Sequence, residues 1–531
     1  MPPLIPEPSA PLYLSHKALD WAFEHAQQFG DTVFLPAAFE YAAIRHSWDS
    51  VRGWLAAQDM VRWAPRPNRR LLAPKSRYSF RYVTQLDPLE YLAFTALLHE
   101  VGPQLEATRS PVSDETVISW RFLLGPNGQM YDPTYEWVLF TQRCQNLALA
   151  DSIESVVVAD IADFFPRVYI HPVERVLVKA TGASPYAYCI LRHIRNWNAL
   201  VSYGLPVGVS GSRIIAEATL NDIDRGLSGA GFSYCRYADD IRIFCLNEIE
   251  ARRALELLAG MLFENHGHTL QPGKTDILTV REYLKRFDIS AERVEAESLT
   301  SRFHHLMIEA GLNDDYHAGR DYDDLSPEVQ EQIDGMNLVA LFNEQVGTER
   351  SDPVIMRILL HRMAQLNIDD IVDDLLANLE SLTHVMDSVV NYLAALRRLD
   401  EQRRYSIGKR VLDSLALPTM GTYERFCLIS LFTKNSEFNQ GGLFESLLTR
   451  FPEPAIRREL VLALGRAGQS HWFMANRRGL PAMDPWTRRA FLAGFSCVSS
   501  DARSPFYRSL RGGADALETA VIRWAEANPF A

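Results

Sequence analysis

Three aspartates follow two short apolar stretches in the middle of the chain. Asp160 closes the run that begins at Ser155, and Asp239 and Asp240 come directly after an alternating stretch that ends near Tyr237. Nucleotidyl transfer onto a hydroxyl uses two divalent ions, which lower the pKa of the attacking oxygen and hold the leaving pyrophosphate. Ions such as Mg²⁺ prefer carboxylate oxygens. We therefore interpret the acids as a two-metal site, with Asp160 and Asp239 as the principal ligands and Asp240 beside them.

These acids converge only if the segments around them belong to one sheet. Residues 155–161 and 232–244 are rich in β-branched and aromatic residues and predict strands, the second segment forming a hairpin with the acid pair at its tip. Between and after them we expect a loop over 204–211, helices over 212–226 and 249–265, and a turn at 271–274 that leads into a strand over 275–280. This mixture predicts an α+β sheet domain.

Helices are predicted on both sides of this domain. Apolar residues recur at helical spacing over 12–60 and 86–105, and Pro103 is expected to end the second region. From about residue 325 the pattern is helical to the last residue, and the segment 452–465 resembles a helix of HEAT-type repeats. No fixed period is visible, so a helical solenoid is our prediction and an irregular bundle is the alternative.

The charge of the chain is unusual for an enzyme of nucleic acid. Its 531 residues carry a formal net charge of −12, whereas phosphate contacts normally come from basic surfaces. One segment compensates, because its basic residues are interleaved with aromatic residues suited to stacking on bases. It contains Arg62, Arg66, Arg69, Arg70, Lys75, Arg77 and Arg81, with Trp63, Tyr78, Phe80 and Tyr82 among them. The alternative is a solvated face beside ordinary core aromatics.

Several other classes of protein are disfavoured. The six cysteines are scattered without a CxxC pair or histidines at zinc-ligand spacing, so we expect neither a zinc site nor a disulfide framework. The first eleven residues lack the basic and apolar regions of a signal peptide, and no stretch of ~18 uncharged apolar residues follows. We expect a soluble, cytoplasmic protein that does not act at a membrane.

Four short motifs, in order along about 120 residues, resemble those of reverse transcriptases. Tyr237-Ala-Asp-Asp240 resembles the Tyr-x-Asp-Asp box, and Asp160-Ile-Ala-Asp-Phe-Phe165 resembles the first acidic motif. Gly204-Leu-Pro-Val-Gly208 with Ser212 is similar to the loop between them, and Gln271-Pro-Gly-Lys274-Thr275 looks like the motif that follows. The resemblance covers roughly residues 60–290 and implies a right-hand polymerase fold with fingers, palm and thumb.

The resemblance also implies roles for residues near the acids. Ile161, next to Asp160, is counted among the metal-binding and nucleotide-binding positions. Phe165 lies at the steric-gate position, where a ring collides with a ribose 2′-hydroxyl, and so implies use of deoxynucleotides. Pro206 and Gly208 would shape a loop that approaches the nucleotide, where a Cβ at 208 would intrude. Lys274 is a candidate to stabilise or protonate pyrophosphate, and the alternative is an exposed lysine in a turn.

Contacts to the rest of the substrate are harder to assign. Three basic residues of the fingers are candidates to bind the triphosphate, without a choice among them, because the family's fingers pattern is poorly kept: Arg69, Arg70 and Lys75. Three further residues are candidates to bind nucleic acid: Arg77, Arg121 and Tyr237. Val207 stands where many reverse transcriptases have Gln, so a hydrogen bond near the nucleotide sugar is not expected.

The C-terminal part distinguishes branches of this family. No protease, integrase, RNase H or maturase pattern is present, and a helical region of ~200 residues follows the palm. This layout is similar to that of bacterial abortive-infection and other defence-associated reverse transcriptases, whose palm is joined to HEAT-like helices. The predicted domains are N-terminal helices and basic fingers over 1–85, fingers and palm over 86–290, a thumb-like linker over 291–330, and a helical repeat domain over 331–531.

The resemblance to this branch implies a DNA polymerase of antiphage defence that uses dNTPs and two Mg²⁺ ions, for which Mn²⁺ can substitute, and that forms a homo-oligomer. It also implies untemplated synthesis primed by a tyrosine hydroxyl, so that the DNA stays attached to the protein. Five tyrosines cannot be separated as primers: Tyr316, Tyr322, Tyr392, Tyr405 and Tyr423. One alternative is an enzyme that copies a dedicated noncoding RNA, as retrons and introns do. Another is an inactive palm that serves as an interaction scaffold.

Overall fold

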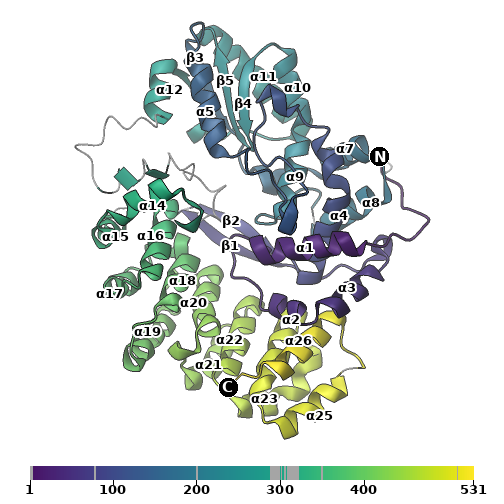
Figure 1. Cartoon of the computed structure of the whole chain (residues 1–531), viewed down its shortest axis with the longest axis vertical. Helices are drawn as coiled ribbons and strands as arrows, with labels where there is room; N and C mark the ends of the chain where they lie inside the picture. Colours follow the sequence, from purple (N-terminus) through teal and green to yellow (C-terminus); the bar gives the residue numbers. More distant parts are fainter. Residues whose placement is uncertain are drawn as a thin grey trace.

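The computed structural model describes residues 4–76, 79–198, 201–287, 322–347, 351–510 and 512–530, with short pieces at 299, 302–303 and 306–307. Arg77, predicted to bind nucleic acid, and most of the predicted linker 291–330 lie outside these residues. Figure 1 shows a sheet domain at the top, a long hairpin across the centre, and an array of helices that curves down the left side and along the bottom. None of the described helices is long and apolar enough to span a bilayer.

A four-stranded antiparallel sheet lies at the centre of the upper domain. Its strands are β3 (Ser155–Asp160), β4 (Ser233–Tyr237), β5 (Asp240–Cys245) and β6 (Asp276–Thr279), in the order β4-β5-β3-β6. The strand predictions over 155–161, 232–244 and 275–280 are thus confirmed to within a few residues. In the β3–β5 register Asp160 stands opposite Asp240. Because the two strands are antiparallel, the end of one meets the beginning of the other, and the acids share one edge of the sheet.

Helices cover both faces of this sheet, which explains why β3 is an almost unbroken β-branched run. Val157, Ala159, Ile241 and Ile243 pack with the helices of one face, α9 (Ser210–Thr219), α10 (Asn221–Gly229) and α11 (Glu248–His266). Val156, Val158 and Phe244 pack with those of the other face, α5 (Trp137–Ala148) and α12 (Val280–Phe287). The single helix predicted over 212–226 is therefore wrong in extent, since the chain forms α9 and α10 with a break at Leu220.

The chain before β3 supplies the hairpin and lies against the sheet domain. It contains α1 (His16–Phe29), α2 (Glu40–His46), α3 (Trp48–Ala56), β1 (Arg69–Ser76), β2 (Ser79–Gln85) and α4 (Pro88–Glu106). The helices α6 (Phe164–Arg167), α7 (Ile170–Thr181) and α8 (Pro185–Trp197) follow β3, and α7 and α8 pack on α4. The basic segment of the sequence is the antiparallel pair β1–β2. Pro103 does not end α4, contrary to the prediction: it lies in the last turn, where its carbonyl still accepts a hydrogen bond from the amide of Ala107 (3.1 Å).

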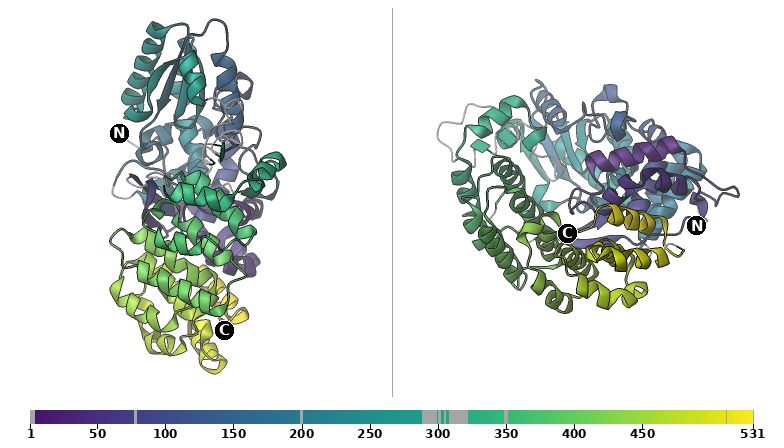
Figure 2. Two further views of the ribbon diagram at one scale, coloured as in Figure 1. Left: turned by 90° about the vertical axis from the view of Figure 1, so that its left-hand side faces the viewer. Right: turned by 60° about the horizontal axis from the view of Figure 1, so that its bottom comes forward.

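The C-terminal half is a regular array of helices, which Figure 2 shows as an arc. Six helices pack one on the next along it: α16 (Pro353–Gln365), α18 (Met386–Ala395), α20 (Thr422–Lys434), α22 (Pro454–Arg466), α24 (Pro485–Gly494) and α26 (Ala516–Ala527). Between them come α17 (Val372–Ala377), α19 (Glu401–Ser414), α21 (Gly441–Arg450), α23 (Ser470–Asn476) and α25 (Ser500–Leu510), and α14 (Pro327–Asp334) and α15 (Leu338–Val346) precede them. The packed helices begin at intervals of 31 to 36 residues, a period that the sequence did not reveal. The assignment of this array of helices to the HEAT-like repeats stays a prediction.

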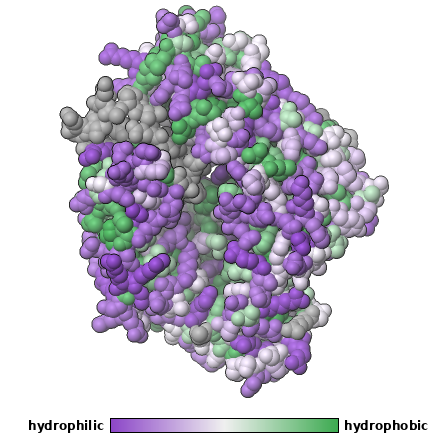
Figure 3. Space-filling model, viewed as in Figure 1, coloured by the Kyte–Doolittle hydropathy of each residue, from purple (hydrophilic) through white to green (hydrophobic). Residues whose placement is uncertain are grey.

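The array closes back onto the N-terminal part. Helix α26 packs on α2 and α3, and α20 packs on β1. Figure 3 shows a hollow on this face between the array on the left and the sheet domain and N-terminal helices on the right. At the junction Glu40 of α2 is fully buried and accepts hydrogen bonds from Arg489 Nε (3.0 Å) and Arg458 Nη2 (2.7 Å). Two cations from the array therefore share one carboxylate from the N-terminal part of the chain.

Replacing Glu40 by Ala should lower the free energy of unfolding by about 3–5 kcal/mol, because the buried Arg458 and Arg489 would lose the carboxylate that they share and keep only Glu459 and Asp87 as partners. Urea denaturation followed by circular dichroism measures the change. Glu24→Ala, which removes an exposed carboxylate from α1, is the matched control and should change stability by no more than about 0.5 kcal/mol. Equal effects of the two substitutions would show that Glu40 does not hold the two halves together.

Candidate active site

Three carboxylates meet at one edge of the sheet, as the sequence predicts. Asp160 is the last residue of β3, Asp240 is the first residue of β5, and Asp239 precedes it in the turn. The amide of Ile161 donates to the carbonyl of Asp239 (3.1 Å), which ties the two acidic segments together. The strand register and this hydrogen bond thus place Asp160 beside the acid pair.

The turn that carries Asp239 is supported from behind by a buried ion network. Ala238 adopts a φ of +54°, in the left-handed region that non-glycine residues rarely enter. Its carbonyl accepts from Arg236 Nη1 (3.0 Å) and its amide donates to Ser119 Oγ (2.9 Å). The fully buried Arg236 is in turn paired with Asp224 (2.7 Å) and Glu217 (2.9 Å). These groups hold the strained turn, and the sequence predicts no role for Arg236, Asp224 or Glu217.

Two of the three acids already have an internal cation. Lys274 Nζ lies 2.8 Å from Asp160 Oδ2, and Arg242 Nη2 lies 3.3 Å from Asp240 Oδ1. Asp239 Oδ1, by contrast, is buried without a hydrogen-bond partner among the described residues. Burial, followed by the charges of Asp240 and Asp160, raises the pKa of Asp239 well above its usual value. Burial also raises the pKa of Asp240, against the opposing charge of Arg242.

The ion pairs and the burial of these acids determine how a metal ion could bind to them. Within the described parts of the chain, no three His, Cys, Asp or Glu side chains are gathered closely enough to form a ready metal cage. The reason is visible in the contacts, since Asp160 is turned to Lys274 and Asp240 to Arg242. The donor set nevertheless suits a hard divalent ion, because one carboxylate oxygen is unpartnered and the cluster is short of positive charge. The residues therefore fit a metal that competes with Lys274 for Asp160.

The acids open into a cavity of about 430 Å³ between the sheet domain and the hairpin. It brings together most of the predicted site residues: Asp160, Asp239, Asp240, Ile161, Phe165, Pro206, Gly208, Lys274 and Lys75. Its walls also include residues to which no site role was assigned from the sequence: Trp120, Arg213, Gln271 and Arg81. Arg81 belongs to the basic segment of the sequence. A cavity of this size, acidic at one end and basic at the other, suits a charged ligand with a planar group.

Aromatic and cationic side chains form the wall beside Phe165. Its ring lies 5.8 Å from that of Trp120, and the guanidinium carbon of Arg213 lies 5.0 Å from the centre of the Trp120 ring. Gly208 has a φ of +100°, and a Cβ there would stand 2.4 Å from Thr32 Oγ1. The close contact with Thr32 therefore explains why position 208 is a glycine, whether or not a nucleotide binds nearby.

Four of the predicted residues are not brought to this cavity. Arg69 is buried against the array, with its guanidinium carbon 4.0 Å from the centre of a Trp486 ring. Arg70 is exposed on the other side of the hairpin, over Tyr82. Other partners explain the remaining two placements: Arg121 is buried and paired with Glu106 (2.7 Å), and Tyr237 is buried among Trp120, Trp137 and Phe140. Of the three candidates for the triphosphate, Lys75 alone lines the cavity.

Comparison with known proteins agrees with this geometry. Residues 116–303 match the family model described as reverse transcriptase (RNA-dependent DNA polymerase), so a reverse transcriptase domain is present. No curated protein sequence matches the chain. Among solved structures, a telomerase from Candida albicans in complex with a fragment of telomeric RNA is 12% identical, with 75% of this chain and 68% of that one covered and a TM-score of 0.31. An apo telomerase from Candida tropicalis is 10% identical, with 69% and 68% covered and a TM-score of 0.33. A similarity of this size says nothing of what the chain acts on.

Asp239→Asn should stabilise the protein in EDTA at neutral pH, raising the midpoint of thermal unfolding by ~2 °C or more. The folded pKa of Asp239 lies above its unfolded value, so ionising this group opposes folding, and that cost disappears as the pH falls below the folded pKa. The advantage of the variant should therefore shrink in acid. Differential scanning calorimetry across pH, with and without Mg²⁺, measures both effects.

The matched control is Asp163→Asn, which removes an exposed carboxylate at the rim of the same cavity. Asn tolerates the left-handed backbone of this position, where φ is +49°. The control should leave the midpoint unchanged at every pH. A lower midpoint for Asp239→Asn in EDTA would mean that the three acids do not repel one another.

Proposed function

We propose that this chain is a DNA polymerase of the reverse-transcriptase type, which adds deoxynucleotides to a hydroxyl in the cavity of about 430 Å³. The observation that carries the proposal is the convergence of Asp160, Asp239 and Asp240 in a cavity that also contains a steric-gate ring and the cations Lys75 and Arg81. The matching reverse transcriptase model over 116–303 supports it. Acids at one end and cations at the other suit a nucleoside triphosphate, whose metal-bound phosphates carry several charges.

The metal-binding residues in this proposal are Asp160, Asp239 and Asp240, with Ile161 beside them. Two Mg²⁺ ions, or Mn²⁺ in their place, would supply Lewis acidity at the attacking and leaving oxygens. The protein's own contribution is to hold the acids on adjacent strands and to keep the Ala238 turn fixed through Arg236. Lys274, hydrogen-bonded to Asp160 in this structure, would be released to face the pyrophosphate.

Phe165 supports the choice of deoxynucleotides over ribonucleotides. Its ring is half-buried in the cavity wall, packed against Trp120 (5.8 Å) and Phe164 (5.3 Å). A side chain held from two sides cannot turn away easily, so it would exclude a sugar hydroxyl by its volume. The cavity would then accept dNTPs in preference to NTPs.

The helical array supports a role in bacterial antiphage defence, by its likeness in layout to the abortive-infection branch. In this proposal synthesis takes place in the cytoplasm in a homo-oligomer, without a conventional template, and starts on a tyrosine. Of the five tyrosines considered, Tyr316 lies outside the described residues, and Tyr405 is exposed. The other three are buried: Tyr322, Tyr392 and Tyr423. A second candidate function is copying of a partner noncoding RNA, which the match to an RNA-dependent polymerase model favours.

Changing Asp239 and Asp240 together to Asn should reduce nucleotide incorporation about a thousandfold or more, because several kcal/mol of transition-state stabilisation would be lost. Incorporation of labelled dNTPs with Mg²⁺, analysed with and without protease treatment, measures activity and any covalent link to protein. Asp276→Asn, on the far edge strand β6, is the control and should retain activity. Undiminished synthesis by the double variant would remove the catalytic assignment, and an inactive wild-type protein would favour the scaffold.

Phe165→Ala should let ribonucleotides enter and lower the preference for dNTPs over NTPs by roughly 10–200-fold, the range that a change in pocket volume can supply. Competition between the two substrates in one reaction measures the ratio. Phe263→Ala removes an exposed ring from α11, away from the cavity, and should leave the ratio unchanged. An unaltered preference in Phe165→Ala would contradict the steric gate.

A further inference from the structure

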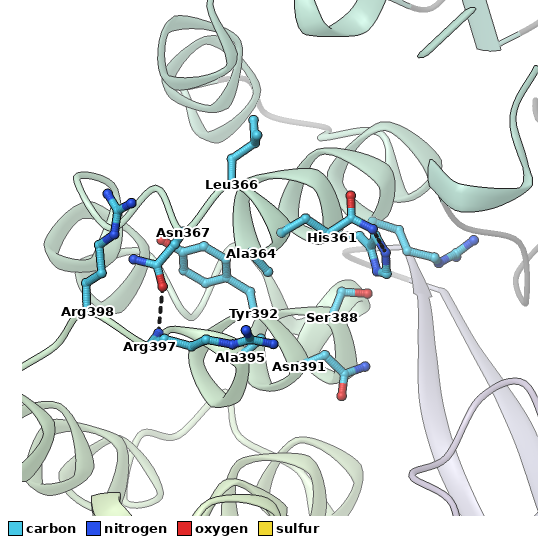
Figure 4. Close-up of a pocket in the computed structure, with 12 residues that line it drawn as sticks. His361, Ala364, Leu366, Asn367, Ser388, Asn391, Tyr392, Ala395, Arg397 and Arg398 are labelled. Atoms are coloured by element: carbon cyan, nitrogen blue, oxygen red, sulfur yellow. Dashed lines mark hydrogen bonds between the residues drawn. The ribbon is translucent and has the colours of Figure 1, made fainter. Parts of the chain in front are cut away.

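A second large cavity, of about 760 Å³, lies in the helical array between α16 and α18 (Figure 4). Its basic lining residues are Arg357, His361, Arg397 and Arg398, and the described residues that line it include no carboxylate. Polar uncharged side chains, among them Asn391, complete the wall. The cavity is therefore cationic in a protein whose formal net charge is −12.

The two adjacent arginines give this cavity its charge. In Figure 4 the side chain of Arg397 runs along the cavity toward Asn391, whereas Arg398 stands at the opposite end beside Asn367. Asn367 Oδ1 accepts from the backbone amide of Arg397 (2.6 Å), which fixes the chain at this point. Both side chains are exposed.

Neither Arg397 nor Arg398 forms an ion pair with any described residue, which sets them apart from their neighbours on the array. Arg403 and Arg410 both pair with Asp373, and Arg404 pairs with Glu437 (3.2 Å). An exposed guanidinium that satisfies no carboxylate of its own chain keeps its donors for an outside anion. The pair therefore supplies positive charge that the protein itself does not use.

Cationic residues connect this cavity with the catalytic one. Lys75 and Arg81 line the catalytic cavity and also a narrow cavity of about 30 Å³ between the hairpin and the array. Arg357 lines the narrow cavity and the large one. A space of about 30 Å³ holds little more than one water, so a ligand would lie along the side chains and not pass through it.

Nearby carboxylates offset part of the positive charge of this row of cations, but not the charge of Arg397 and Arg398 at its end. Asp387 also lines the narrow cavity, where its charge acts on Arg357, and Asp323 lies 3.3 Å from His361. Asp369 and Asp370 lie near the hydroxyl of Tyr392, on the side of the cavity where this group donates to the carbonyl of Ile368 (2.7 Å). Arg397 and Arg398 are left as the uncompensated cations.

We propose that the array binds a single-stranded nucleic acid, with backbone phosphates on Arg397 and Arg398 and with the end of the strand in the catalytic cavity. A row of cations that runs through three adjoining cavities fits a polyanion better than a single phosphate compound. Guanidinium groups bind phosphate oxygens in a bidentate manner and without regard to base sequence. The identification of the polyanion as nucleic acid rests on the proposed function, because the row begins where that function places the growing strand.

The test compares full-length Arg397→Ala/Arg398→Ala with the wild type in binding a fluorescent 30-nucleotide oligo(dT), by anisotropy in EDTA without nucleotides. Affinity should fall about tenfold or more at low salt. A plot of log affinity against log salt concentration has a negative slope, and this slope should become less steep by about 1.4, the value for two lost phosphate contacts to a single strand. A 5-nucleotide oligo(dT), which occupies the catalytic cavity alone, should bind both proteins equally.

The matched control is Arg477→Ala/Arg478→Ala, an adjacent exposed pair elsewhere on the array that removes the same charge. It should keep the wild-type salt slope. An unchanged slope in the 397/398 variant, or an equal loss in both variants, would overturn the proposal. So would equal competition by polyglutamate of the same length, which would assign the cavity to an acidic protein segment. Because binding is measured without metal or dNTPs, failed binding and failed polymerase chemistry are separate results.

Discussion

The buried carboxylate of Glu40 holds the two halves of the molecule together. Burial of one acid with Arg458 and Arg489 is favourable only while all three are present and hydrogen-bonded, since a lone charge in this place would be costly. Asp87 extends the junction, because it pairs with Arg489 (3.0 Å) and with Arg66. This junction keeps β1 of the hairpin packed against α20 of the array. Lys75 and Arg81 consequently face the catalytic cavity on one side and the array on the other.

A second constraint acts at the edge of the sheet, where three carboxylates share a small volume. Their repulsion is relieved by Lys274, from the turn that follows α11, and by Arg242, two residues after Asp240 on β5. The third acid, Asp239, receives no such relief, and the strained turn that presents it is held by Arg236. The buried acids at this edge therefore lack part of the positive charge that would balance them, which costs stability at this point.

The two constraints share a physical basis. In each, charged groups are taken out of water and depend on partners from distant parts of the chain, so the position of one segment fixes the position of another. Glu40 does this between the ends of the molecule, and Arg236 does it between the acidic turn and the helices α9 and α10 through Glu217 and Asp224. Buried ion networks of this kind favour one arrangement of the domains, because other arrangements leave charges unpaired.

The local features of this protein can be predicted from its residues. The strands, the convergence of Asp160 with Asp239 and Asp240, and the helical character of the second half follow from patterns within a few residues, because β-branched runs and helical spacing act over that range. Other features depend on distant segments. The sequence predicts Arg69 and Arg121 as phosphate or nucleic-acid ligands, but Trp486 covers Arg69 and Glu106 pairs with Arg121 in the folded chain. Gly208 is needed because Thr32, from a distant segment, packs closely against it. The cationic row that includes Arg357 exists only after the array folds back on the hairpin, since burial and pairing are properties of the packed chain.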